Sequence, residues 1–203
     1  MFERYTKVMK KAILTLPIAM LVASHGTPAA LGQTLAPSQP AVSQRDGSHD
    51  FDWLAGKWHM TFRRLRKPLT GSHDWYSFEG SVENRSLWNG GGNFESGRLN
   101  SPLGAIDFAT LRLYDATKHE WSIYWVTAKN GLGLPPEVGS FDEHGVGKFY
   151  CWNDSYEGRT IASRYIWTPV GPPKHYHFEQ AFSTDHGTTW EVNWISDVYR
   201  TSG

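Results

Sequence analysis

The sequence predicts an all-β protein, a closed antiparallel barrel of about ten strands with a short helical plug at its N-terminal end. After Gly56, apolar and polar residues alternate in one run after another, and short turn-forming stretches separate the runs. No stretch after Gly56 keeps a helical apolar period for ten residues. A meander of this kind leaves two exposed edges unless the first and last strands pair, so closure into an up-and-down barrel is expected.

The plug and the first strand meet at Gly56. Before this glycine, apolar residues lie one to three positions apart, which fits a helical turn: Phe51, Trp53 and Leu54. Ser48, Asp50 and Asp52 are available as N-terminal caps. After the glycine, the apolar side of a strand is formed by Trp58 and the residues at alternate positions that follow it.

Nine further runs are predicted as strands. They are 75–88, 94–99, 107–114, 120–128, 137–141, 146–153, 160–168, 175–183 and 189–200. The stretches between them are rich in Gly, Pro, Asn and Asp, and nearly all are short enough for hairpins. About eight to ten strands leave a lumen that holds one small ligand.

The N-terminal segment looks like a secretory leader. Four basic residues precede the apolar run 12–23, and small residues follow it, so residues 1–32 are predicted to be a signal peptide. The run has 12 residues, fewer than the roughly 20 that a membrane span needs. Residues 33–47, rich in Pro, Ser and Gln, are predicted to be a disordered linker, and 48–203 the barrel domain. We therefore expect a bacterial protein that is secreted or periplasmic, with no stable membrane span after cleavage.

The charge of the chain argues against nucleic-acid binding, and its cysteine content excludes an intrachain disulfide. Residues 1–32 carry four of the 20 Lys and Arg and one of the 20 Asp and Glu, which leaves 16 basic and 19 acidic residues, a charge of −3. The only basic run is 63–67, so nucleic-acid binding is not expected. Cys151 is the single cysteine, which excludes an intrachain disulfide, and it is interpreted as a packed apolar residue.

The start of the first strand resembles a known superfamily. Gly56-Lys57-Trp58 is similar to the Gly-x-Trp start of lipocalins and fatty-acid-binding proteins, the calycin barrels. The resemblance implies a lipocalin-like barrel whose floor is closed by Trp58. It also implies that Arg200, on the last strand, stacks on Trp58 by a cation–π contact.

A more specific resemblance covers 49–200. It rests on the opening His-Asp-Phe-Asp-Trp-Leu-x-Gly-x-Trp at 49–58 and on four later motifs, at 63–65, 112–115, 121–125 and 180–194. These motifs resemble a bacterial domain-of-unknown-function family whose expected shape is a lipocalin-like barrel. The family brings no established catalytic residues.

Two motifs are weighed between structural and functional interpretations. Ser183-x-Asp185-x-Gly187-x-Thr189-Trp190 matches the Asp box of sialidases. There is one copy rather than a repeat, so we interpret it as a structural turn in which Asp185 accepts N–H bonds, Gly187 supplies positive φ and Trp190 folds back over the loop.

His175, His177 and Glu179 alternate, so they share one face of a strand. That face either holds a metal or is a solvated outer face, and we favour the second, with no metal.

Aromatic excess points to the candidate binding site. The chain has 10 Trp, many interleaved with polar residues, which is typical of a small-molecule pocket as well as of a packed core. Parity from Trp58 turns Arg64 inward, and Trp190, Val192 and Trp194 share the side of Arg200 unless a bulge intervenes. The predicted binding residues are Trp58, Arg64, Trp125, Tyr165, Glu179 and Trp194.

The sequence thus predicts an exported, monomeric or homodimeric barrel that binds a small apolar or aromatic molecule and needs no cofactor. Two alternatives stay open. One is a cofactor-free isomerase, cyclase or lyase that uses a buried Glu–Arg or Glu–His pair in the lumen, whose catalytic residues the sequence does not name. The other is a structural envelope protein with a filled core. An unpaired Glu or Arg in the lumen favours the enzyme, an apolar lumen favours carriage, and a filled interior favours the structural protein.

Overall fold

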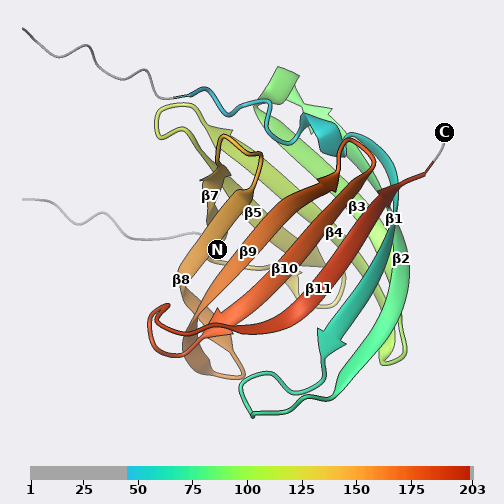
Figure 1. Ribbon diagram of the computed structural model, residues 1–203, viewed down its shortest axis with the longest axis vertical. Helices are drawn as coiled ribbons and strands as arrows, with labels where there is room; N and C mark the ends of the chain where they lie inside the picture. The colour runs from blue at the N-terminus through green and yellow to red at the C-terminus, as the bar shows by residue number, and fades with distance from the viewer. Residues whose placement is uncertain (1–44, 202–203) are drawn as a thin grey trace, which may run out of the picture. The chain divides into compact units, whose positions relative to one another are not determined.

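The computed structural model describes residues 45–201, and these form a closed antiparallel barrel (Figure 1). Its strands are β1 (Gly56–Leu65), β2 (Trp75–Leu87), β3 (Gly92–Ser101), β4 (Gly104–Asp115), β5 (Glu120–Thr127), β6 (Gly131–Leu132), β7 (Glu137–Phe141), β8 (Gly147–Tyr156), β9 (Arg159–Gly171), β10 (His175–Ser183) and β11 (Glu191–Arg200). Two 3-10 turns complete the described elements, η1 (Asp52–Leu54) and η2 (Trp88–Gly90). The predicted fold class is confirmed, and each of the ten predicted strands has its counterpart.

Ten of the described strands form the ring, and β6 is a short addition to β5. The ring follows chain order from β1 to β5, passes to β7, and runs on to β11. It closes because β1 pairs with β11, from Trp58 opposite Arg200 to Arg64 opposite Trp194. Figure 1 shows β11 lying between β10 and β1. The barrel therefore has an inside, as the predicted pocket requires.

The segment before β1 closes one end of the barrel. Phe51 is buried and packs edge-on against Trp121, with ring centroids 5.0 Å apart, and against Phe141 at 4.9 Å. The Trp58 indole donates to the Leu54 carbonyl at 2.6 Å. The helical turn is the three-residue η1, and none of the available side chains caps it. We call this end, formed by residues 47–58 and Arg200, the floor.

Arg200 fastens the floor to the last strand. Its guanidinium lies over the Trp58 ring at 4.2 Å from the centroid and donates to the Ala55 carbonyl at 2.8 Å. A second guanidinium nitrogen donates to the Trp53 carbonyl. This is the contact that the calycin resemblance implies for Arg200.

The N-terminal boundary of the barrel differs slightly from the prediction. Gly47 is buried; its N–H donates to the Tyr114 hydroxyl at 2.9 Å, and its carbonyl accepts from the Trp121 indole at 3.0 Å. Gly47 therefore belongs to the barrel rather than to the linker. The predicted leader, 1–32, and the linker up to residue 44 lie outside the described residues. Within 45–201, no helix has the length and apolar character needed to cross a bilayer.

Candidate binding site in the barrel lumen

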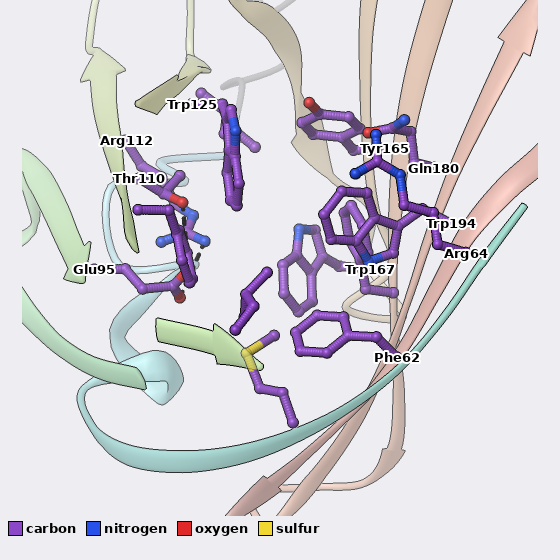
Figure 2. Close-up of a pocket in the computed structure, with 15 residues that line it drawn as sticks. Phe62, Arg64, Glu95, Thr110, Arg112, Trp125, Tyr165, Trp167, Gln180 and Trp194 are labelled. Atoms are coloured by element: carbon purple, nitrogen blue, oxygen red, sulfur yellow. Dashed lines mark hydrogen bonds and ion pairs between the residues drawn. The ribbon is translucent and has the colours of Figure 1, made fainter. Parts of the chain in front are cut away.

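The lumen contains a cavity of about 200 Å³. Its walls come from seven strands and are mainly aromatic, with Phe62, Phe108, Trp125, Trp167, Phe178 and Trp194 among the lining residues (Figure 2). Phe108 and Trp125 stack at 4.5 Å between centroids, and Trp194 meets Trp125 edge-on at 6.0 Å. For scale, a dry engineered cavity of about 150 Å³ binds benzene. The lumen is thus large enough for a flat molecule of one or two rings.

Four of the six predicted binding residues line this cavity: Arg64, Trp125, Tyr165 and Trp194. Arg64 follows from strand parity, because the buried residues Trp58, Met60 and Phe62 alternate along β1 and the half-buried Arg64 is the next position on their side. The structure brings Arg64 and Trp194 together, since the guanidinium lies 4.5 Å from the centroid of the indole ring.

Trp58 and Glu179 do not line the cavity. Trp58 is fully buried in the floor, between Leu54 and Arg200, and so is part of the closure. On β10, Phe178 and Gln180 line the lumen, and alternation therefore turns Glu179 to the outer face. Glu179 lies there beside His177, with 3.4 Å between the His177 Nε2 and the Glu179 Oε1.

Trp190 does not lie on the side of Arg200, as parity along the last strand predicted, because a β-bulge intervenes. Gln180 pairs with Trp194 and the next residue, Ala181, with Val192, so Asn193 is left over on β11. The extra residue reverses parity beyond it. Trp190 accordingly lies with Trp152 in an edge-on contact at 6.3 Å, away from the cavity lining.

A buried ion pair forms the deep end of the cavity, next to the floor. Arg112 and Glu95 are 2% and 3% exposed, and an Arg112 Nη2–Glu95 Oε2 distance of 3.3 Å joins them. Glu95 also accepts from the Thr110 hydroxyl at 3.3 Å and from the Asn84 amide at 3.2 Å, and Arg112 donates to Asn93 at 2.8 Å. Such bonds are what a buried pair needs to offset its loss of hydration.

The Arg112 guanidinium is held between rings as well. Its central carbon lies 5.1 Å from the Phe51 centroid and 5.9 Å from that of Trp167, so the plug rests on this cation. The Nε of Arg112 is buried and has no acceptor among the described residues. Sequence reasoning missed Glu95 and Arg112. The signal that could have found them is strand parity, because Glu95 is four residues from the buried Leu99 on β3 and Arg112 is four residues from the buried Phe108 on β4.

The other end of the cavity carries Arg64, Tyr165 and Gln180. Figure 2 shows these three side chains with Trp194 on one side of the lumen and Glu95, Thr110 and Arg112 on the opposite side. Gln180 is fixed by a bond from its amide to the Asn193 Oδ1 at 2.8 Å. The Trp194 Nε1 is a second buried donor without an acceptor among the described residues.

A second buried carboxyl, that of Glu137, lies behind Tyr165. Glu137 is buried on β7 and accepts from the Ser163 hydroxyl at 3.1 Å. Burial raises the pKa of Glu137 to about 7, although hydrogen bonding from Tyr165 and Ser163 lowers it. Burial, and then the charge of Glu137, raise the pKa of the Tyr165 phenol well above its usual value. Sequence reasoning missed Glu137 as well, because β7 is short and shows little alternation.

The histidines of β10 lie on the outer face. His175 and His177 approach the Asp197 Oδ1 at 3.0 and 3.1 Å. Burial raises the pKa of Asp197, but the bonds from His177 and His175 outweigh it, so this pKa lies below its ordinary value. Within 45–201, no group of three or more His, Cys, Asp or Glu side chains is arranged to hold a metal ion.

The Asp box forms a tight turn between β10 and β11. Asp185 accepts from the Thr189 hydroxyl at 2.6 Å, from the Thr189 N–H at 2.9 Å and from the Ser183 hydroxyl at 2.7 Å. These bonds hold the pKa of Asp185 at about 2. Gly187 has a φ of +85°, and its carbonyl accepts from the Trp190 indole at 3.0 Å. Every one of these hydrogen bonds is internal to the turn, and none of residues 183–190 lines the cavity.

Comparison with known proteins extends only to the fold. No protein-family model matches the chain, and no curated protein is similar to it in sequence. Among solved structures, the chain is similar to the S-type phycobiliprotein lyase CPES from Guillardia theta, with a TM-score of 0.54 and 9% sequence identity. The match covers 79% of this chain and 95% of that one. At this identity the likeness shows a shared fold.

Proposed function

We propose that this barrel binds a small, largely apolar or aromatic molecule in its lumen. The observation that carries the proposal is the cavity of about 200 Å³, walled by aromatic rings and bounded by polar groups at both ends. Most ligand sites have this composition, apolar walls with a few placed polar groups. An unfilled interior also counts against a purely structural protein, and the similar fold of a phycobiliprotein lyase supports a lumen used for ligand chemistry.

Isothermal titration with a neutral two-ring probe, naphthalene-2-carboxamide, tests the proposal. We expect saturable one-to-one binding with a Kd below about 1 mM, given about 0.3 kcal/mol or more per ligand heavy atom. Ile123→Trp should abolish binding, because Ile123 lines the cavity and the indole would fill it. Tyr124→Trp is the matched control, since the adjacent residue points out of the barrel.

The outcome against the proposal is an absence of binding by a folded protein, or equal binding by both variants. Circular dichroism and a thermal melt of each variant establish that it is folded. Native mass spectrometry of the protein purified from its own host then identifies the natural occupant.

We further propose that the chain is exported. The order of basic, apolar and small residues over 1–32 supports this. The intact mass of the protein recovered from its own host tests it: a mass that lacks the leader, in the periplasmic or extracellular fraction, is expected. Full-length chain in the cytoplasm would contradict it.

A cofactor-free enzyme is the second candidate, and Glu137 favours it. A guanidinium is not deprotonated in proteins, so an arginine in the lumen binds charge and exchanges no proton. Glu137 differs, because a carboxyl with a pKa of about 7 is matched to proton transfer at neutral pH. Tyr165 lines the lumen beside Glu137. Its hydroxyl therefore offers a route for a proton between a molecule in the lumen and the Glu137 carboxyl.

The flat two-ring probe 5-nitrobenzisoxazole tests this candidate. The Tyr165 oxygen takes the ring C–H proton while the Tyr165 hydroxyl proton passes to ionised Glu137; the C–H electron pair forms the nitrile, and the N–O bond breaks to give a coloured cyanophenolate. We expect a rate that increases as the pH rises through about 7, since the base must be ionised, and that Glu137→Gln abolishes. The exposed Glu143→Gln serves as control. Equal rates for wild type and Glu137→Gln would remove this candidate.

A further inference from the structure

The lumen has one more positive charge than it has negative charges. Three charged residues line it, Arg64, Glu95 and Arg112, and Glu95 neutralises Arg112. Within 45–201, no carboxylate forms an ion pair with Arg64. The cavity wall therefore carries a net charge of +1, which sits at the end opposite the buried pair (Figure 2).

Packing against Trp194 fixes the position of the Arg64 guanidinium. Cation–π contact with the Trp194 ring, at 4.5 Å, holds it over the cavity wall. The neighbouring Arg63 provides a comparison, because it is exposed, points to the opposite face and lies over Trp75 at 5.4 Å. Both adjacent arginines thus make a cation–π contact with a tryptophan, but only Arg64 faces the lumen.

Two side chains that line the lumen also carry buried donors without partners. The Trp194 indole N–H, in a residue 9% exposed, and the Arg112 Nε–H are buried and have no acceptor among the described residues. Buried donors are nearly always paired in folded proteins. At the Arg64 end, the guanidinium lines the cavity with its charge and its N–H donors, so a ligand group that accepts hydrogen bonds and carries negative charge fits there.

We propose that the ligand is a small planar aromatic carboxylate, with its rings among Trp125, Trp167 and Trp194 and its carboxylate on Arg64. This inference rests on the proposed binding in the lumen and names the class of molecule bound there. A guanidinium pairs with a carboxylate through parallel N–H bonds, which are about twice as strong as bonds between neutral groups. A cationic ligand would meet Arg64 as a like charge, and a neutral one would leave its charge without a partner.

Three probes of one shape test the inference: naphthalene-2-carboxylate, naphthalene-2-carboxamide and 2-naphthylmethylammonium. In titrations at 0.15 M salt, we expect the carboxylate to bind at least tenfold more tightly than the amide, and the ammonium to bind most weakly. Arg64→Gln should bring carboxylate and amide to within about threefold of each other. Arg64→Lys should keep part of the preference because it keeps the charge, and Arg63→Gln should leave the preference unchanged.

The results separate the two proposals. Equal affinity of wild type for carboxylate and amide, or an undiminished preference in folded Arg64→Gln, would overturn the inference while leaving lumen binding in place. Failure of all three probes to bind the folded wild type would overturn both.

Discussion

At the scale of single residues, the two buried glutamates of the barrel are stabilised differently. Glu95 pairs with Arg112 and receives further bonds from Thr110 and Asn84, so its charge is compensated. Glu137 has hydroxyl partners and forms no ion pair with any residue of 45–201, and burial raises its pKa to about 7. The Glu95–Arg112 pair therefore has a structural role at the deep end of the cavity. Glu137, by contrast, is a group that changes charge at neutral pH.

Glu137 should make the stability of the barrel fall as the pH rises. In the unfolded chain a glutamate ionises near its ordinary pKa of 4.5, whereas in the folded chain Glu137 keeps its proton to about 7. Between these values the folded state binds more protons, so the free energy of unfolding decreases with rising pH. From pH 5 to pH 8 we expect a loss of about 2–3 kcal/mol from this residue. Urea denaturation at the two pH values measures it.

Glu137→Gln should remove this loss, because the amide carries no charge at either pH. The exposed Glu143→Gln should retain it, which shows that the effect belongs to the buried carboxyl. A slope with pH that is the same in wild type and Glu137→Gln would assign the effect to other groups.

At the scale of elements, how much of each strand could be predicted depended on its pattern. On β1 the apolar residues alternate cleanly, so parity placed Arg64 in the lumen. On β4 the alternation is hidden, because outward positions are also apolar, among them Ala109, Leu111 and Leu113. Arg112 was therefore not recognised as an inward residue, although Phe108 and Thr110 share its side.

The deep ion pair could not be predicted for a further reason. Glu95 and Arg112 lie on neighbouring strands two register positions apart, since Glu95 pairs with Thr110 and Asn93 with Arg112. Register depends on the length and type of the turn between β3 and β4, which the sequence leaves open to within a residue. A one-residue shift would have turned either side chain outward. The same limit produced the wrong side for Trp190, because one extra residue at Asn193 is invisible before the pairing is known.

Glycines on β2 and β3 allow these neighbouring strands to approach each other closely, and Gly97 is the sharper case. A Cβ at Gly97 would lie 2.4 Å from the Ser81 carbonyl oxygen and 3.0 Å from the Val82 Cα, both backbone atoms. Gly97→Ala should therefore destabilise the barrel by about 1–3 kcal/mol, the usual cost of overpacking. Gly158→Ala is the control, because its φ of +76° is unfavourable for alanine while no atom lies within 4 Å. Urea midpoints compare the two.

If steric contact decides, Gly97→Ala costs more than Gly158→Ala, whose cost of about 1 kcal/mol comes from backbone conformation alone. Equal costs would mean that β2 and β3 separate without difficulty. The inner wall would then be more adaptable than the contacts suggest.

At the scale of the whole molecule, closure is uneven around the ring. β1 pairs with β11 over seven residues and with β2 over ten. β5 pairs with β7 over three residues only, from Trp121 opposite Gly139 to Ile123 opposite Glu137. The plug, Arg200 and β11 all contact β1. The short β7, by contrast, pairs with β8 over only four residues. The ring therefore has one weak seam, and Glu137 lies on it.

Hydrogen exchange should find this seam. Local opening costs less where few backbone hydrogen bonds must break, so amides of 120–127 and 137–141 should exchange at least about tenfold faster than those of 56–65 and 191–200. Peptide-level exchange followed by mass spectrometry resolves these segments. Naphthalene-2-carboxylate should slow exchange over 120–127, because Trp125 on β5 lines the cavity that the probe occupies. Uniform exchange around the ring would mean that the floor and the core, rather than strand pairing, set the stability of the seam, since Phe51 packs there against both Trp121 and Phe141.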